Sequence, residues 1–444
     1  MTFCAIDFGT SNSAIAIPSA VGSTHGMRLV PLEGEYLTMP TAVFYCTDAD
    51  DLPTGVHRPR DTAAQPELPR TFGRAAVKSY IEGYEGRLMR SMKSVLGTAL
   101  IDQTTEVGHG YGVKYLDIIV GYLRHLRESA QAAGGQPLDH LVMGRPVFFV
   151  DDEPERDAQA QRSLEAAARA VGFKEVAFQF EPIAAAFDHE QHLQGEEVVL
   201  VADIGGGTSD FSVVRVGPER AKRIDRREDI LANHGVHVAG TDFDRRVSLR
   251  SIMPALGYGG FGPAGNGLPP RPVPSRVYFD LTTWHLINTV YQPQRMAELR
   301  AMVDFYGEPM HHQRLLKVVQ ERLGHALVGL AESAKIAVAE GGQHDIDLSL
   351  IERGLHELFN DTMAEHALSD DLARIVACAH DAVKMAGVHP GDIGAVYFTG
   401  GSTGLSLLTS QLERAFPQAR AVRGDRLASV ATGLGLHAAR LFKG

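Results

Sequence analysis

The chain has 444 residues, of which 44% are hydrophobic and 22% are charged, as is usual for a globular protein. This length predicts two to three domains rather than one small core. The formal net charge of −11 argues against a general affinity for nucleic acid or for anionic membranes.

Three scattered cysteines, Cys4, Cys46 and Cys378, have no metal-ligand spacing and fit a reducing compartment. No secretory signal is recognisable at the N-terminus, and no apolar run approaches the ~18 residues that a membrane span needs. The sequence therefore predicts a cytoplasmic protein without membrane or nucleic-acid partners.

The first predicted element is a strand, a turn and a second strand at the N-terminus. Residues 3–6 form an apolar run that ends in Asp7, and a second apolar run covers residues 14–17. The turn between the runs offers four residues to a ligand: Gly9, Thr10, Ser11 and Asn12.

Two helices are predicted next. Residues 115–126 carry an apolar stripe at helical spacing, with a plausible stop at Gly134 and Gly135. Residues 157–171 read as a second helix that ends near Gly172. The stripes are expected to face a core.

The N-terminal pattern returns in the middle of the chain. Residues 198–202 form an apolar run that ends in Asp203, and a further apolar run covers residues 211–214. The turn between these runs contains Gly205, Gly206, Gly207, Thr208, Ser209 and Asp210. Asp7 and Asp203 are 196 positions apart (203 minus 7), and this internal echo indicates a duplicated domain.

The remaining elements alternate between helices and irregular segments. Residues 314–339 and 371–386 are predicted helices, and residues 48–69 and 254–275 are predicted loops rich in proline. His189, His192 and the pair His311–His312 have no partners at metal spacing and are interpreted as surface residues. The alternation of strands and helices predicts an α/β fold in which helices cover a mixed sheet.

The two glycine turns are candidate phosphate sites. Glycine lets successive backbone N–H groups surround an anion, and Thr10 and Thr208 add hydroxyl donors. Asp7 and Asp203 would repel phosphate directly, so they fit a bound Mg²⁺ that lies between them and the phosphates. Either hairpin alone could be a tight β-turn without a ligand, but the matched pair favours phosphate binding.

Taken together, the motifs resemble the nucleotide-binding domain of the DnaK-type, seventy-kilodalton heat-shock chaperones. The matching segments occur in the order of that family and cover nearly the whole chain: residues 6–12, 93–97, 181–186, 203–210, 239–244, 396–403 and 430–435. The chain resembles the short, YegD-like members of that family, which are described as chaperones. The resemblance implies an actin-like ATPase with two duplicated, ribonuclease H-like lobes around a nucleotide cleft.

The resemblance also implies the extent of each lobe. Lobe I would comprise residues 1–194 and 425–444. Lobe II would comprise residues 195–424, with a helical subdomain that includes the insertion 254–275.

Site roles follow from the same resemblance. Lys93 would contact the γ-phosphate of ATP, while Glu181 and Asp210 would hold or polarise the attacking water. Thr208 would belong to the same catalytic set as a hydroxyl donor. Asp7 and Asp203 would organise Mg²⁺. The implied ATP or ADP contacts are Gly9, Thr10, Ser11, Asn12, Gly205, Gly206, Gly207, Thr208, Gly240, Glu332, Lys335, Gly400, Gly401 and Ser402.

Several of these residues have a purely structural alternative. Lys93 could be an exposed helical lysine, and Glu181 could simply begin a helix before a proline. Glu332 and Lys335 could form a surface ion pair, and Asp210 could cap its turn.

The chain also departs from the chaperone pattern. Ile336 and Gly404 stand where that family carries two arginines that sandwich the adenine. The sequence ends soon after the last motif, which predicts that the linker and the peptide-binding domain are absent. The expected function is therefore that of a slow ATPase, a heat-shock-70-like chaperone acting on an unknown protein partner or client. An actin-like scaffold or filament protein is the alternative, followed by a small-molecule kinase.

Overall fold

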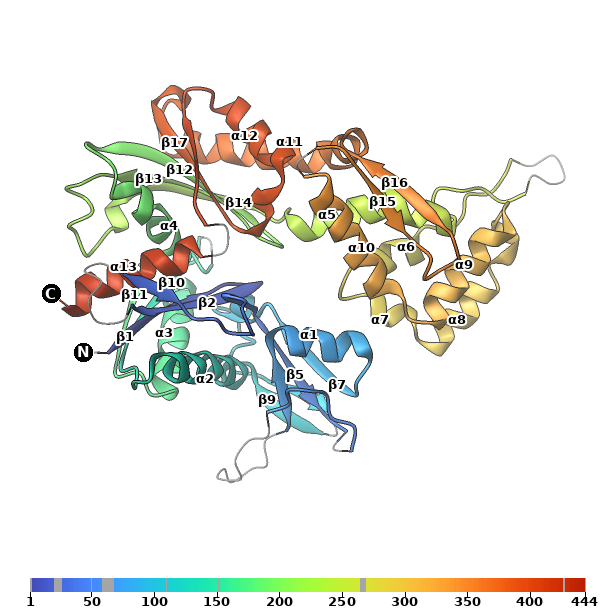
Figure 1. Cartoon of the computed structure of the whole chain (residues 1–444), viewed down its shortest axis with the longest axis horizontal. Coiled ribbons are helices and arrows are strands. Elements are labelled where there is room, and N and C mark those ends of the chain that lie inside the picture. The colour runs from blue at the N-terminus through green and yellow to red at the C-terminus, as the bar shows by residue number, and fades with distance from the viewer. Residues whose placement is uncertain are drawn as a thin grey trace.

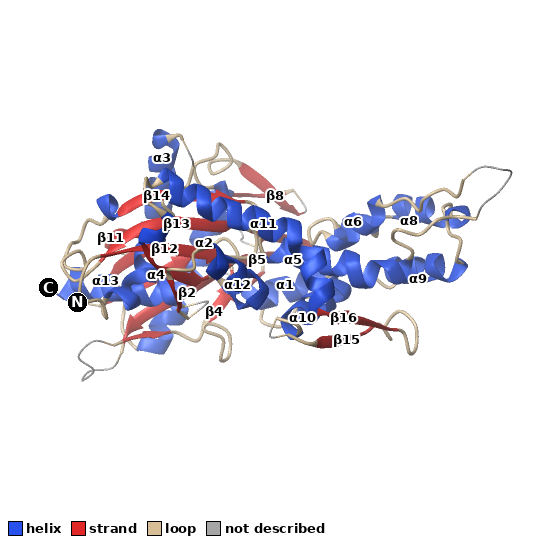
Figure 2. Ribbon diagram, turned by 90° about the horizontal axis from the view of Figure 1, so that it is seen from above, coloured by secondary structure: helices blue, strands red, loops and turns tan. Residues whose placement is uncertain are grey.

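The computed structural model describes residues 2–19, 26–48, 50–57, 68–108, 110–150, 152–263, 269–339, 341–425 and 428–443. It has two main sheets with helices around and between them, and a mostly helical region that projects to one side (Figures 1 and 2). The two ends of the chain lie close together (Figure 1), and the rings of Phe3 and Phe442 are 6.1 Å apart. In the part of the chain described here, no helix is both long and apolar enough to cross a membrane.

The first main sheet has the strand order β11-β10-β1-β2-β3, and β4 pairs with β2. Its strands are β1 (Phe3–Phe8), β2 (Asn12–Pro18), β3 (Met27–Leu29), β4 (Thr38–Pro40), β10 (His140–Arg145) and β11 (Glu175–Phe180). β1 is parallel to β10 and antiparallel to β2, so the predicted N-terminal hairpin lies in the middle of this sheet.

The second main sheet has the order β14-β13-β12-β17-β18. Its strands are β12 (Glu197–Ile204), β13 (Ser209–Val216), β14 (Ile230–Val236), β17 (Ile393–Thr399) and β18 (Arg420–Arg423). β12 is antiparallel to β13 and parallel to β17. Both main sheets therefore combine a central hairpin, a further antiparallel strand beside it and two parallel strands on its other side.

Helices cover both sheets and fill the space between them. The first sheet packs on α2 (Tyr115–Gly134) and α3 (Pro154–Ala170), and the second packs on α11 (Asp361–Met385) and α12 (Ser406–Ala415). Between the sheets lie α4 (Glu181–Glu190) and α13 (Ser429–Lys443) (Figure 1).

The side-chain period of two explains this layering. Along β12, Val199 and Val201 face α4 and α13, while Leu200 and Ala202 face α11 and α12. A strand buried on both faces must be apolar at nearly every position, as residues 198–202 are.

Smaller elements extend the two sheets. Beside the first sheet lie β5 (Ala42–Cys46), β6 (Arg70–Phe72), α1 (Gly73–Glu82), β7 (Gly86–Arg90), β8 (Thr104–Gly108) and β9 (Tyr111–Lys114). Beside the second sheet lie α5 (Gly240–Val247), α6 (Arg276–Thr282), α7 (Ile287–Val290), α8 (Pro293–Arg300), α9 (Pro309–Gln320), α10 (Gly324–Ala337), β15 (Gln343–Asp347) and β16 (His356–Asn360). The helical group has its own apolar core, in which α6, α9 and α10 meet.

The α/β fold class and the helix predicted from residue 115 are confirmed. α2 ends at Gly135, whose φ of 67° gives the left-handed conformation typical of a helix end. The helix predicted over 371–386 begins ten residues earlier, because the Asn360 side chain accepts a hydrogen bond from the Met363 N–H and caps α11.

The single helix predicted over residues 314–339 is wrong, because two helices occupy this segment. α9 ends before Arg322, which has a left-handed φ of 55°. The N–H of Leu323 then bonds to the Val318 carbonyl, as in a Schellman motif. The sequence hides this stop because an arginine occupies the position usually taken by glycine.

Two of the histidines predicted at the surface are buried. His189 is 8% exposed and its Nε2 lies 3.1 Å from Glu197, while His312 is 4% exposed and its Nε2 lies 2.8 Å from the Leu299 carbonyl. The predicted loops fall partly outside the described residues, at 49, 58–67 and 264–268. The described remainder of 254–275 is largely irregular, with an isolated bridge between Phe261 and Pro272.

Candidate functional site

The two predicted glycine turns face each other across one cavity. A methyl group added to Gly206 in the second turn would lie 3.0 Å from the Ser11 hydroxyl of the first. Gly9 needs to be glycine, because a Cβ there would lie 2.3 Å from the Asn12 carbonyl oxygen. The sheets thus bring together two turns that the sequence separates by almost half of the chain.

Each turn is held in shape by a threonine outside it. The Thr41 hydroxyl donates to the Gly9 carbonyl at 2.8 Å, and the Thr241 hydroxyl donates to the Gly206 carbonyl at 2.8 Å. These bonds occupy carbonyl groups of the turns. These two hydrogen bonds therefore help to fix the conformation of both turns.

The cavity has a volume of about 1990 Å³ and is lined by residues from both sheets and from the helical region. Every residue that the sequence predicted for catalysis, nucleotide contact or metal binding lines it: Asp7, Gly9, Thr10, Ser11, Asn12, Lys93, Glu181, Asp203, Gly205, Gly206, Gly207, Thr208, Asp210, Gly240, Glu332, Lys335, Gly400, Gly401 and Ser402. The structure therefore gathers these residues around one space.

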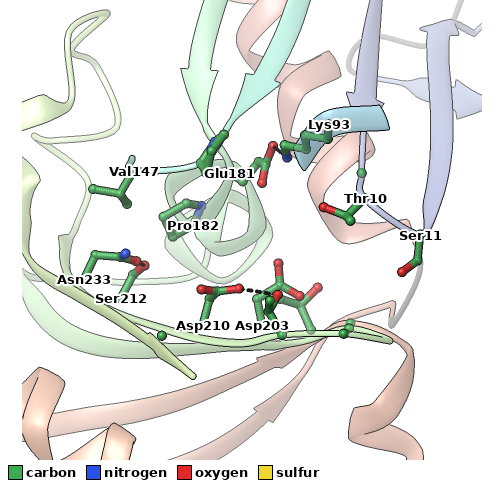
Figure 3. A pocket seen from close by; sticks show the side chains of 18 of the residues that line it. Thr10, Ser11, Lys93, Val147, Glu181, Pro182, Asp203, Asp210, Ser212 and Asn233 are labelled. Carbon is green, nitrogen blue, oxygen red and sulfur yellow. Dashed lines mark hydrogen bonds and ion pairs between the residues drawn. The ribbon is translucent and has the colours of Figure 1, made fainter. Parts of the chain in front are cut away.

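Lys93 and Glu181 form a partly buried ion pair at this cavity. Lys93 lies in a short 3-10 helix, Met92–Val95, and its Nζ is 2.6 Å from Glu181 Oε1. Glu181 is the first residue of α4, so it begins a helix and also points at the lysine. Figure 3 shows this pair on one side of the cavity and Asp203 and Asp210 on the other.

The carboxylates around Lys93 are crowded. Burial, together with the charges of Glu181 and Asp203, raises the pKa of Asp7 to about 8. Burial, together with the charges of Asp210 and Glu181, raises the pKa of Asp203 to about 7. Burial also raises the pKa of Asp210, against the hydrogen bond that the Thr208 hydroxyl donates to it at 2.8 Å.

One ammonium group opposes these carboxylates. Burial alone would lower the pKa of Lys93, but Glu181 and Asp7 outweigh this effect and raise it. The charge of Lys93 does not balance four acidic side chains that come so close together. Carboxylate oxygens in excess of their counter-charges are the ligand type that Mg²⁺ prefers, so the donor set of Asp7 and Asp203 fits such an ion.

The predicted adenosine segment meets the second glycine turn. Gly400 has a φ of 87°, and a Cβ there would lie 2.5 Å from the Ile204 carbonyl oxygen. The Ser402 hydroxyl donates to the Gly205 carbonyl at 2.7 Å. Gly240 is part of the same contact, because a Cβ there would lie 2.4 Å from the Ser402 Oγ. Ser402 is therefore bound to the backbone of the turn.

Glu332 and Lys335 lie on α10 at the edge of the same cavity. Lys335 Nζ lies 2.6 Å from Asp244 Oδ1 of α5, and this pair replaces the Glu332–Lys335 pair considered from the spacing. Burial raises the pKa of Asp244 to about 6, against the charge of Lys335. Ile336 lines the cavity next to them and is 61% exposed.

Two cavity residues were missed by the sequence analysis. Asp244 lies in a segment that carries the resemblance, 239–244, but received no role. Arg90, at the end of β7, carries no sequence signal beyond its position three residues before Lys93. Both side chains acquire their partners only through contacts between distant segments.

Comparison with known proteins places this site in a family context. The sequence profile described as "Hsp70 protein" matches residues 4–249, which is more than half of the chain. The profile spans both glycine turns, Lys93 and Glu181.

Curated relatives agree with the profile. The chain is 28% identical over 253 residues to "Chaperone protein dnaK" of Gracilaria tenuistipitata var. liui, a match that covers 54% of this chain and 36% of that protein. It is 28% identical over 255 residues to "Heat shock 70 kDa protein 7, chloroplastic" of Arabidopsis thaliana, covering 54% of this chain and 31% of that protein. It is also 28% identical over 255 residues to "Stromal 70 kDa heat shock-related protein, chloroplastic" of Pisum sativum, covering 54% of this chain and 32% of that protein. The match spans about a third of the length of each relative.

Proposed function

This chain belongs to the Hsp70 protein family, and from that premise we propose that it binds Mg²⁺–ATP in the cavity between its two main sheets and hydrolyses it slowly. The observation that carries the proposal is the Lys93–Glu181 pair, which faces Asp203 and Asp210 across the space between two glycine turns. Such a site supplies positioning and charge neutralisation, which phosphoryl transfer needs more than covalent chemistry.

The phosphates would lie between the two turns. N–H groups of residues 9–12 and 206–208 would surround them, with the hydroxyls of Thr10 and Thr208 as additional donors. Gly400 and Gly401 would let the backbone approach the diphosphate closely. Glu332 and Lys335 would lie beside the ribose and the base, and Gly240 would complete the floor of the site.

Asp7 and Asp203 would hold the metal, whose positive charge offsets that of the phosphates and of the crowded carboxylates when it is bound. Lys93 would orient the terminal phosphate. Glu181 and Asp210 would orient the attacking water and accept its proton, with Thr208 fixing Asp210 through their 2.8 Å hydrogen bond.

We also propose that the protein consists of two related lobes, residues 1–194 with 425–444 and residues 195–424. The shared pattern of strand directions in the two main sheets supports this division. α13 also supports it, because this C-terminal helix packs against β1 and α4 of the first lobe. Closure of the lobes around the nucleotide would be the output, read by a protein partner or client.

Calorimetry with ATP and ADP, with and without Mg²⁺, tests binding, and a phosphate-release assay tests turnover. We expect Mg²⁺-dependent binding and slow release of phosphate. Absence of nucleotide binding at millimolar ATP would overturn the proposal.

A further inference from the structure

Arg90 stands out among the cations that line the cavity. Three others are matched with a carboxylate: Lys93 with Glu181 at 2.6 Å, Arg145 with Asp157 at 2.8 Å and Lys335 with Asp244 at 2.6 Å. Among the described residues, Arg162, Arg227 and Arg90 line the cavity without a carboxylate partner, and of these three it is Arg90 that lies against an aromatic ring and close to Lys93 in the chain. Its charge therefore faces the cavity without a counter-ion from the protein.

The ring of Trp284, from a distant part of the chain, holds this arginine in place. The Arg90 guanidinium lies 4.3 Å from the ring centre of Trp284, in the loop between α6 and α7. Trp284 stacks on Tyr80 of α1 at 5.1 Å and meets His325 of α10 at 5.0 Å. The face of an indole attracts a cation without neutralising it, so this contact positions Arg90 but leaves its charge available.

The partly buried position of Arg90 disfavours its charged form. Burial lowers the pKa of Arg90, and the phenol of Tyr80 opposes this effect. The side chain nevertheless keeps an exposed surface, because it lines the open cavity. An anion bound in the cavity would supply the missing counter-charge.

Resting on the proposed function, we infer that Arg90 is a further nucleotide-contacting residue, which meets the terminal phosphates of a nucleoside triphosphate while Trp284 holds its guanidinium. Arg90 is three residues from Lys93 and lines the same cavity. A guanidinium gives directed, charge-assisted hydrogen bonds to phosphate oxygens. The contact would add affinity for triphosphates rather than for the base.

The test uses Trp284, the only tryptophan of the chain, as a fluorescent reporter in the full-length protein. Mg²⁺–tripolyphosphate, which has no base, and Mg²⁺–ATP are titrated against wild type and Arg90→Ala. The matched control is Arg87→Ala in the same strand. Arg87→Ala removes the same charge as Arg90→Ala. The Arg87 guanidinium, however, donates to the Glu106 carbonyl, and Arg87 is not among the residues that line the cavity.

We expect Arg90→Ala to weaken binding of tripolyphosphate and ATP by about tenfold or more, and Arg87→Ala to change it less than about twofold. The loss of affinity in Arg90→Ala should become smaller as the salt concentration rises. It should be absent for AMP, which lacks the terminal phosphates. Because fluorescence depends on the Trp284 contact itself, calorimetry is the second measurement of affinity.

Three further variants separate loss of the contact from loss of folding. Arg90→Lys keeps a cation and should retain part of the affinity. Trp284→Phe keeps an aromatic platform and should bind triphosphate more tightly than Trp284→Ala. The inference would be overturned if Arg90→Ala and Arg87→Ala bound triphosphate with equal affinity, or if Arg90→Ala lost as much affinity for AMP as for triphosphate. Either result would leave the proposed function standing. If wild type binds neither ATP nor tripolyphosphate, the proposed function and this inference fall together.

Discussion

The ammonium of Lys93 lies 2.6 Å from a carboxylate oxygen of Glu181, although the two residues are 88 positions apart in the chain. Their side chains are only 10% and 14% exposed. Burying such a pair costs desolvation free energy unless hydrogen bonds and the attraction between the two charges offset it. It fixes the lysine at the edge of the cavity, opposite Asp203 and Asp210 (Figure 3).

Replacing Lys93 should separate catalysis from binding. Lys93→Ala should lower the rate of phosphate release by at least about a hundredfold, because the charge that orients the terminal phosphate is lost. ATP affinity should fall far less, because in the proposed site backbone N–H groups and the metal would provide most of it. Lys78→Ala, at an exposed lysine of α1 that is 69% accessible, is the matched control. Normal turnover by Lys93→Ala would contradict the catalytic role.

Substitution of Asp7 should change how stability depends on pH. In the ligand-free protein, a folded pKa of about 8 means that the native state holds a proton that the unfolded state has released. Native stability should therefore fall as pH rises from 6.5 to 8.5, by about 1–2 kcal/mol.

Asp7→Asn removes this titration, so its stability should depend less on pH in that window and should exceed that of wild type at pH 8.5. Urea unfolding at the two pH values is the measurement. Asp139→Asn, at a surface partner of Lys174, should follow the wild-type pH dependence. A drop in stability as steep in Asp7→Asn as in wild type would refute the assignment.

The proposed base end of the site should bind the adenine weakly, because the two stacking arginines of DnaK-type chaperones are replaced there. Ile336 and Gly404 line the cavity where DnaK-type chaperones carry arginines. Placing arginine at both positions should tighten ATP binding roughly tenfold and sharpen discrimination against GTP. Leu358→Arg, at an exposed position of β16 that does not line the cavity, controls for the added charge. Nanomolar ATP affinity in the natural sequence would contradict this prediction.

Gly400→Ala should destabilise the protein by at least about 2 kcal/mol, because the residue is left-handed and its Cβ would collide with the Ile204 carbonyl. Gly207→Ala in the neighbouring turn has open space around its Cβ and should leave stability nearly unchanged. Thermal unfolding of both variants tests the contrast. Equal stabilities would show that the segment around Gly400 can relax.

A buried ion-pair network should contribute more to the free energy of unfolding than an ion pair at the surface. Arg226 is 0% exposed, lies 2.8 Å from Glu190 at the end of α4 and also pairs with Asp229. Glu190→Gln should destabilise the protein by about 3–5 kcal/mol, because it leaves a buried cation partly unpaired. Glu196→Gln, at a 55% exposed partner of Arg220, should cost less than about 1 kcal/mol. Denaturant unfolding of the two variants measures both losses of stability, and similar losses for Glu190→Gln and Glu196→Gln would contradict the prediction.

The sequence was sufficient for features that depend on neighbouring residues. The two hairpins that contain Asp7 and Asp203 and the helix α2 were predictable, because strand alternation, glycine turns and helical spacing are properties of short segments. The motifs around them also carried the family membership, which the matched profile shows. The end of α9 was not predictable, because a left-handed Arg322 depends on hydrogen bonds formed after folding.

The tertiary structure alone decided which residues meet. It placed Ser402 on the Gly205 carbonyl, 197 positions away, and gave Lys335 the partner Asp244 instead of Glu332. It also brought Arg90 against Trp284 from separate parts of the fold. Local patterns encode which face of an element is apolar, but the distances between side chains on different elements follow from how the layers pack.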